Sequence, residues 1–337
     1  MRVLLTGGAG FIGSHVAEAL RSAGDEVVVL DRDPVPGDSD ARVGDVTDAR
    51  TVAAALVGVD AVCHQAAKVG LGVDFADAVG YVTDNDLGTA VLLTALHDAK
   101  FRGAFVMASS MVVYGEGRYQ CGEHGMVSAA PRRATDLDAG RFEPPCPVCD
   151  RPLIPRRVPE TAPTDPRNVY AATKLAQEHL AFAFAREHPD VCVTALRYHN
   201  VYGPGMPRDT PYAGVAAIFT DALASGRAPA VFEDGAQLRD FVHVADVARA
   251  NLLALRAGQP GAFNVASGQP RRLLEMADAL ADAFGPDAPR PEVVGGWRGG
   301  DVRHVFASPD RAAEILGFIA GVDFTQGMAE LVGRLQP

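Results

Sequence analysis

The sequence predicts an α/β protein built on a doubly wound parallel sheet, with a smaller C-terminal lobe. From the N-terminus to about residue 105, short runs of branched apolar residues alternate with segments whose apolar residues recur at helical spacing. A glycine-rich turn separates the first run from the first helical segment. Alternation of this kind requires right-handed crossovers and therefore a sheet covered by helices on both faces.

The individual elements follow from that alternation. Strands rich in branched residues are expected at 2–6, 26–31, 59–64, 104–108 and 191–197. Helical spacing predicts helices at 11–23, 48–57, 85–100 and 168–188. Shorter helices are expected at 213–225, 244–257, 271–284 and 326–335.

Two boundaries follow from this pattern. Residues 1–200 are expected to form the sheet domain and residues 201–337 the smaller lobe, with some exchange of chain between them. An insert at about 116–160 breaks the rhythm, because it is rich in Pro, Arg, Gly and Cys and shows little periodicity. So long a stretch without regular structure is expected to be functional or held by something else.

Composition excludes several classes of protein. The 337 residues carry a net charge of −11 with scattered basic residues, which argues against nucleic-acid binding and against adhesion to anionic lipid. No apolar run approaches the roughly 20 residues that a membrane span needs. Five cysteines without an export signal make a disulfide framework unexpected and predict a cytoplasmic location.

The glycine-rich turn predicts a Rossmann dinucleotide site. Gly7, Gly10 and Gly13 surround Phe11 and Ile12 in a G-x-x-G-x-x-G pattern. Gly7 permits a tight turn, Gly10 lets backbone amides approach a pyrophosphate, and Gly13 lets helix and strand pack closely.

The end of the second predicted strand indicates which dinucleotide binds. Asp31 stands about 20 residues after the glycines, where a carboxylate accepts hydrogen bonds from a ribose and repels a 2′-phosphate. NAD is therefore favoured, while the adjacent Arg32 leaves NADP open.

Three polar residues predict general-base chemistry. Tyr170 and Lys174 are four residues apart and therefore lie on one face of a helix. A nearby ammonium is expected to lower the phenol pKa. Ser110 ends a buried strand, so its hydroxyl is expected at the carboxyl edge of the sheet, within reach of the same substrate hydroxyl.

The insert carries a possible metal site. Cys121, His124, Cys146 and Cys149 form a C-x₂-H…C-x₂-C pattern, whose spacing suits a tetrahedral structural zinc site. Unliganded thiols in a flexible loop are the alternative. Cys63 and Cys192 lie in apolar strand patterns and are expected in the core.

Five motifs together resemble the extended short-chain dehydrogenase/reductase family, in its nucleotide-sugar epimerase and dehydratase branch. They are TGGAGFIG, SSMVVYG, YAATK, RYHNVYGP and RDFVHVADVARA, and the resemblance covers nearly the whole chain outside the insert. It implies a catalytic triad of Ser110, Tyr170 and Lys174, with Lys174 also holding the nicotinamide ribose. Further cofactor positions implied are Asp45, Val46, Ala66, Ala67 and Asn85. Substrate positions implied are Asn200, Arg239, Arg298 and Asp301.

The resemblance also narrows the reaction. Sugar 4,6-dehydratases carry Asp-Glu after the catalytic threonine, and related decarboxylases carry a glutamate two positions on. Here Met111 and Val112 follow Ser110, and neither titrates. The expectation is therefore NAD-dependent 4-epimerisation of a dTDP- or UDP-linked sugar. The insert resembles that of bacterial dTDP-L-rhamnose 4-epimerases.

Several alternatives stay open. The sugar could be a UDP-hexose or UDP-uronate, the enzyme could be an NAD(P)H-dependent nucleotide-4-ketosugar reductase, or the chain could be an NAD-binding regulator. The family commonly forms homodimers through the helices at 85–100 and 169–188. Their apolar residues are more numerous than one buried stripe needs; these are Leu92, Leu93, Leu96, Leu175, Leu180, Phe182 and Phe184.

Overall fold

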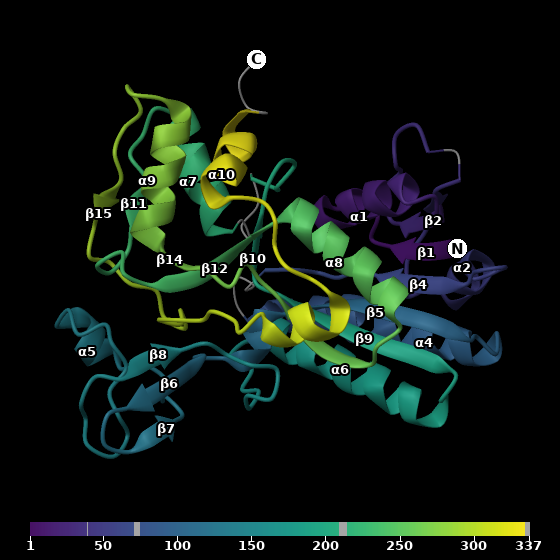
Figure 1. Ribbon diagram of the computed structural model, residues 1–337, viewed down its shortest axis with the longest axis horizontal. Helices are drawn as coiled ribbons and strands as arrows, with labels where there is room; N and C mark the ends of the chain where they lie inside the picture. The colour runs from purple at the N-terminus through teal and green to yellow at the C-terminus, as the bar shows by residue number, and fades with distance from the viewer. Residues whose placement is uncertain (39, 71–74, 209–213, 334–337) are drawn as a thin grey trace.

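The computed structural model describes residues 1–38, 40–70, 75–208 and 214–333, and its centre is a parallel sheet of seven strands (Figure 1). The strand order is β13-β9-β5-β4-β1-β2-β3, so the chain winds outward from β1 in both directions. This confirms the predicted doubly wound class. The strands are β1 Arg2–Thr6, β2 Glu26–Asp31, β3 Arg42–Val43, β4 Ala61–His64, β5 Gly103–Ser110, β9 Val191–Tyr198 and β13 Gly261–Val265.

Alternate residues of each strand enter two separate cores. Val3 and Leu5 of β1 pack with helices α1 (Phe11–Ser22) and α8 (Val244–Ala257) on one face. Leu4 packs with the opposite set of helices on the other face. Because both faces are covered, the strands are apolar on both sides. The second set comprises α2 Ala49–Ala55, α4 Gly88–Asp98 and α6 Val169–Glu187.

The predicted helix at 85–100 is part of a longer helical run. It begins with α3 (Ala78–Tyr81) after the 3-10 turn η1 (Phe75–Asp77), passes through the π-helical segment η2 (Val82–Leu87), and continues as α4. Sequence spacing alone could not place its start, because the wider π turn shifts the apolar period.

The C-terminal part of the chain supplies both a lobe and pieces of the main sheet. Strand β13, helix α8 and the short π-helical segment η4 (Ala312–Leu316) return to the seven-stranded sheet. The lobe has its own core around Phe219, Leu280 and Leu331. Its elements are β10 Asn200–Tyr202, α7 Val215–Ala224, β11 Ala230–Val231, β12 Leu238–His243, β14 Pro270–Arg272, α9 Leu273–Phe284, β15 Glu292–Val293 and α10 Phe324–Gly333.

The insert is more regular than its composition predicts. It follows the 3-10 turn η3 (Met111–Tyr114) and forms a three-stranded sheet in the order β7-β6-β8 with a short helix, beside the C-terminal lobe (Figure 1). Its strands are too short to show a period of two, which explains why the pattern was missed. The elements are β6 Arg118–Cys121, β7 Gly125–Val127, α5 Ala134–Asp138 and β8 Ile154–Arg156.

Within the described ranges, no helix combines the length and the apolar character that a bilayer span requires.

Candidate active site

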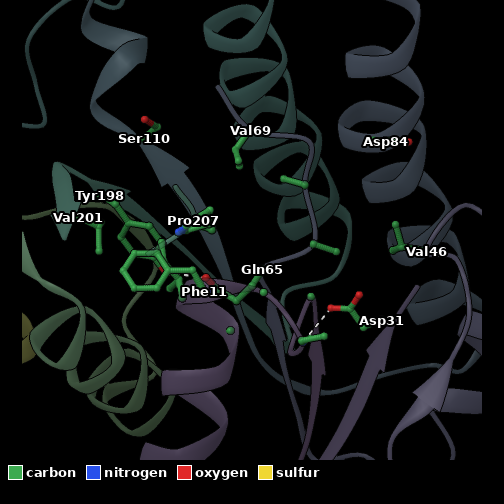
Figure 2. A pocket seen from close by; sticks show the side chains of 18 of the residues that line it. Phe11, Asp31, Val46, Gln65, Val69, Asp84, Ser110, Tyr198, Val201 and Pro207 are labelled. Atoms are coloured by element: carbon green, nitrogen blue, oxygen red, sulfur yellow. Dashed lines mark hydrogen bonds between the residues drawn. The ribbon is translucent and has the colours of Figure 1, made fainter. Parts of the chain in front are cut away.

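A cavity of about 570 Å³ lies at the carboxyl ends of the central strands (Figure 2). It is lined by Gly7, Gly10 and Gly13 of the turn, with Phe11 and Ile12 between them. Gly7 has φ +74°, and a Cβ there would stand 2.6 Å from the Ala66 nitrogen. A Cβ on Gly13 would stand 1.9 Å from the carbonyl oxygen of Gly7. These two positions therefore require glycine, as the motif predicts.

Asp31 lies at one side of the cavity, away from Ser110 (Figure 2). Its Oδ2 accepts a 2.9 Å hydrogen bond from the Ala9 amide, so the carboxylate is fixed beside the glycine turn. Arg32 is also at this side, but two carboxylates hold it. Its Nε lies 2.7 Å from Asp45 and its Nη2 lies 2.7 Å from Asp84. These bonds raise the pKa of Arg32. The two carboxylates also neutralise the guanidinium charge that would otherwise attract the 2′-phosphate of NADP.

Three further predicted cofactor residues, Val46, Ala66 and Ala67, line the cavity, but two do not. Asp45 faces Arg32 and also accepts hydrogen bonds from the amide and hydroxyl of Thr47. Burial raises the pKa of this carboxyl, but the hydrogen bonds from Arg32 and Thr47 together outweigh it, so the pKa is lowered. Asp45 therefore shapes the site through Arg32.

Asn85 is the second residue that does not line the cavity. Its side chain is fully buried, accepts a 2.7 Å bond from the Lys68 amide and donates to the Lys68 carbonyl oxygen. It also donates to the Thr173 hydroxyl at 2.9 Å. Asn85 thus ties the loop that carries Ala66 and Ala67 to helix α6, a positioning role that the motif alone could not reveal.

Ser110, Tyr170 and Lys174 all line the same cavity as the glycine turn. Ser110 ends β5 and accepts a 3.4 Å bond from the Val112 amide, which leaves its proton free to donate elsewhere. Tyr170 stands in the first turn of α6, where Asn168 caps the helix by accepting from the Ala171 amide. The structure thus brings Ser110 into the same cavity as Tyr170 and Lys174, although Ser110 precedes Tyr170 by 60 positions in the sequence.

The expected lowering of the Tyr170 pKa by Lys174 is not found. Burial raises the pKa of Tyr170 to about 12, although hydrogen bonding with Ser110 counteracts part of this effect. The Lys174 ammonium instead donates a 3.0 Å bond to the carbonyl oxygen of Ala108. Burial also lowers the pKa of Lys174 to about 8. In the protein alone, the ammonium anchors α6 to β5 more than it polarises the phenol.

The cavity contains polar residues that the sequence did not single out. Tyr198 donates to Gln65 Oε1 at 3.1 Å and to Asn251 Oδ1 at 3.0 Å, which fixes the floor beside the glycine turn. His199 is buried, and burial lowers its pKa to about 3, so its ring is neutral. Both residues belong to the motif RYHNVYGP, in which the resemblance assigned a role only to Asn200.

Of the predicted substrate residues, Ser110 lines this cavity, but Asn200, Arg239, Arg298 and Asp301 are not among its described lining residues. Asn200 begins β10, and its buried Oδ1 has no hydrogen-bond donor among the described residues. Arg239 on β12 donates to the carbonyl oxygens of Leu238, Val302 and Arg303. Arg298 is exposed and lies over the Phe232 ring at 4.9 Å. Asp301 is half-buried; burial raises its pKa, and the charges of Arg239 and Arg298 oppose that rise.

The insert brings its four predicted metal ligands together. Sγ of Cys121 lies 3.4 Å from Nδ1 of His124 and 3.7 Å from Sγ of Cys149, and Sγ of Cys146 lies 3.7 Å from the same nitrogen. All four ligand atoms lie within 4.8 Å of one another. Tetrahedral zinc with bonds of about 2.3 Å to sulfur and 2.0–2.1 Å to nitrogen spaces its ligand atoms about 3.5–3.8 Å apart. A disulfide would need about 2.05 Å.

Comparison with known families identifies the chain's relationship. The model of the NAD dependent epimerase/dehydratase family matches residues 3–134 and 148–266. The chain belongs to this family. The break between the two matched ranges falls inside the insert, so the cysteines and histidine are not all part of what the family shares.

Individual members of the family match over almost their full length. A dTDP-L-rhamnose 4-epimerase of Burkholderia thailandensis is 34% identical, over 98% of this chain and 93% of that protein. A dTDP-glucose 4,6-dehydratase of Actinoplanes is 31% identical over 98% and 97%. The crystal structure of the Thermus thermophilus UDP-glucose 4-epimerase in complex with NAD superposes with a TM-score of 0.79, at 31% identity, over 100% and 99% of the two chains.

Proposed function

We propose that the protein is an NAD-dependent nucleotide-sugar 4-epimerase that oxidises the sugar transiently to its 4-keto form. The observation that carries the proposal is that Tyr170, Lys174 and Ser110 line one cavity with the glycine turn. A base, an anchored ammonium and a dinucleotide cradle in one cavity match the requirements of reversible carbinol oxidation.

The cradle fits NAD in particular. Gly7 and Gly13 leave the room that Cβ atoms would fill, and Asp31 faces the cavity where a ribose hydroxyl would need an acceptor. Arg32 is neutralised by Asp45 and Asp84, which supports NAD over NADP. Bound NAD⁺ would supply the hydride acceptor and a positive charge that favours ionisation of a phenol.

The chain's own residues manage the proton. Tyr170 takes the proton of the C4 hydroxyl during oxidation and returns it during reduction. Ser110 donates its free proton to the same oxygen and holds it in line. Lys174, fixed by Ala108, would hold the ribose next to the reacting carbon.

The residues after Ser110 favour epimerisation over elimination. Met111 and Val112 begin the 3-10 turn η3 directly after the serine. Elimination of water needs an acid and a base near the sugar ring. Neither of these side chains titrates, so these two positions offer no group for that proton transfer.

The substrate we propose is dTDP-L-rhamnose, with a UDP-hexose or UDP-uronate as the alternative. The Burkholderia relative supports the first, and the Thermus epimerase supports the second. Asn200, Arg239 and Arg298 would contact the diphosphate, and Asp301 would contact the ribose of the nucleotide. The buried Oδ1 of Asn200 has no donor among the described residues, so it could accept from a hydroxyl group of the substrate, while its Nδ2 could donate to the diphosphate.

The test is turnover without a reductant. Purified protein is incubated with dTDP-L-rhamnose or a UDP-hexose, with no added NAD(P)H, and proton NMR follows the configuration at C4. The proposal predicts a C4 epimer with no net change in absorbance at 340 nm. Strict dependence on added NAD(P)H would identify a ketosugar reductase instead.

Zinc is the second cofactor we propose, held structurally by Cys121, His124, Cys146 and Cys149. The ligand spacing and the small core around it support this assignment. Four protein ligands leave no open position for catalysis. Zinc binding needs reduced thiols, which agrees with the expected cytoplasmic location.

We also propose a homodimer, on a residue set that shares only Leu180 with the set expected from the sequence. Leu92, Leu93 and Leu96 are buried against the sheet, which accounts for much of the apolar excess. Support comes instead from exposed residues of the adjoining α3–η2–α4 run and α6, namely Val79, Val82, Leu87 and Leu180. Sedimentation equilibrium tests this: a mass near that of one 35.4 kDa chain contradicts the dimer.

A further inference from the structure

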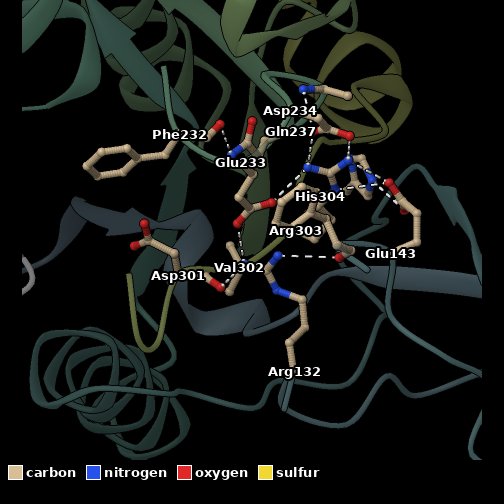
Figure 3. Close-up of polar contacts among 12 residues, drawn as sticks. Arg132, Glu143, Phe232, Glu233, Asp234, Gln237, Asp301, Val302, Arg303 and His304 are labelled. Atoms are coloured by element: carbon tan, nitrogen blue, oxygen red, sulfur yellow. Dashed lines mark hydrogen bonds and ion pairs between the residues drawn. The ribbon is translucent and has the colours of Figure 1, made fainter. Parts of the chain in front are cut away.

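The insert reaches across to the C-terminal lobe through one carboxylate. Glu143 Oε1 lies 2.8 Å from Arg303 Nη2, and Glu143 Oε2 lies 2.9 Å from His304 Nε2 (Figure 3). The Arg303 side chain is only 1% exposed and also bonds Glu233 and Asp234 of the lobe at 2.8 and 2.7 Å. A buried guanidinium shared between three carboxylates holds its neighbours in one geometry.

A second residue of the insert holds the same segment at its other end. Arg132 Nη2 donates to the main-chain carbonyl oxygen of Asp301 at 2.7 Å and pairs with Glu233 at 2.8 Å. Its side chain is 4% exposed. At the Glu143 end, the Tyr119 hydroxyl also accepts a 3.1 Å bond from the His304 amide. The insert therefore holds the segment 301–304 at both ends.

This segment carries the residues expected to contact the nucleotide. Asp301 belongs to it, Arg298 precedes it across two glycines, and the Arg239 guanidinium donates to the carbonyl oxygens of Val302 and Arg303. Residues 294–304 form neither helix nor strand. The next residue, Val305, makes a single β-bridge with Arg239. With so little regular structure of its own, the segment owes its position to contacts from outside.

The insert in turn has little to hold it together. Its core consists of Tyr119, Cys121, Ala129, Cys146 and Leu153, of which two are the proposed metal ligands. A core this small does not order a chain of this length without a staple.

We propose that the metal-held insert is a clamp that positions the nucleotide-binding segment 298–304, with Glu143 and Arg132 as its positioning residues. The ligand class is a nucleoside diphosphate sugar, so the inference rests on the proposed function. The clamp acts on the nucleotide half of the site, far along the chain from the glycine turn, and therefore sets substrate affinity without setting NAD retention.

Two variants and a control test the clamp by binding as well as by activity. Glu143→Gln weakens the bonds to Arg303 and His304 but keeps every metal ligand. Cys149→Ser removes one metal ligand but keeps Glu143. Arg156→Gln is the control, because among the described residues this exposed side chain on β8 bonds only Gln120 and the Pro155 carbonyl oxygen, both within the insert. Zinc is measured by elemental mass spectrometry, NAD by release on denaturation, and dTDP affinity by calorimetry.

The clamp predicts a split between binding and chemistry. Glu143→Gln should keep zinc and NAD but bind dTDP about tenfold more weakly, with a matching rise in KM and kcat within about twofold of wild type. Cys149→Ser should lose zinc and show the same weakening, while Arg156→Gln should match wild type. Unchanged dTDP affinity in Glu143→Gln would overturn the clamp, even if Cys149→Ser does not fold.

Failure of the clamp and failure of the proposed function give different results. Wild-type protein that binds dTDP but forms no C4 epimer contradicts the epimerase, while the weakened dTDP binding of Glu143→Gln would still support the clamp. Wild-type protein without zinc removes the metal from the clamp and overturns the proposal as stated.

Discussion

The Lys174 ammonium donates a 3.0 Å hydrogen bond to the main-chain carbonyl oxygen of Ala108, two residues before Ser110. This bond joins helix α6 to the end of strand β5. It therefore fixes Tyr170, one helical turn earlier, relative to the serine that shares its cavity. The charge it buries also has a cost, since burial lowers the pKa of Lys174 to about 8.

Replacing Tyr170 with phenylalanine removes the proposed base and leaves the ring. We expect kcat to fall by about 10²–10⁴-fold, because positioned proton transfer contributes that much. NAD content, measured after denaturation, should stay at the wild-type level, since the glycine turn and Asp31 are intact. An NAD-binding regulator would instead keep its function in this variant.

Replacing Lys174 with methionine should abolish activity but remove the stability cost of a buried charge. Below about pH 8 the native protein holds a buried charge that the unfolded chain exposes to water. Between about pH 8 and pH 10.5 the unfolded chain binds more protons than the native one, so the contribution of Lys174 to stability rises with pH.

The pH dependence of this stability difference can be measured directly. Thermal melts of cofactor-free wild type and Lys174→Met are compared from about pH 7 to about pH 10. We expect the Tm of the variant, relative to wild type, to be highest near neutral pH and to decline as pH rises. Activity should be lost throughout. A Tm difference that does not change with pH would contradict a buried, pKa-lowered Lys174.

Replacing Asp31 with serine should shift the choice of dinucleotide. The carboxylate that repels a 2′-phosphate is lost, so the ratio of NADPH to NADH affinity should rise about tenfold. Fluorescence titration of cofactor-free protein measures both. Arg32 stays paired with Asp45 and Asp84, which limits the gain. Asp40→Ser, a change at an exposed carboxylate of the same loop, should leave the ratio unchanged.

Removing zinc should loosen the insert without unfolding the sheet. The insert's apolar core is small, whereas the seven-stranded sheet has two large cores. After treatment with a strong chelator, we expect limited trypsin digestion to cut first between residues 122 and 152. Peptide mass spectrometry locates the cuts. First cuts in the sheet domain, or no change on chelation, would contradict a metal-dependent insert.

The sheet and the cofactor turn could be predicted because their signals are local. Branched runs such as Glu26–Asp31 and the Gly7–Gly13 spacing contain the physical reason for the structure within a few residues. The triad was predicted for the same reason: Tyr170 and Lys174 share a helix face, and Ser110 ends a strand.

The sequence did not reveal contacts that depend on a distant partner. Asp45 faces Arg32, and Asn85 faces Lys68 and Thr173, so neither lines the cavity. Leu92 belongs to the core against the sheet. The number of apolar residues in a helix does not show which of them face the sheet, so the sequence could not predict this. Arg303 and Glu143 escaped notice altogether, since 160 residues separate two groups that meet only in the fold.

The most direct test of the central claim uses a sugar nucleotide labelled with deuterium at C4. If Tyr170 holds the hydroxyl proton while the C4 hydrogen stays on a retained cofactor and returns within one site, the epimerised product keeps the label, and mass spectrometry shows no loss to solvent. Epimer that has exchanged its C4 deuterium for solvent hydrogen would contradict transient oxidation at C4.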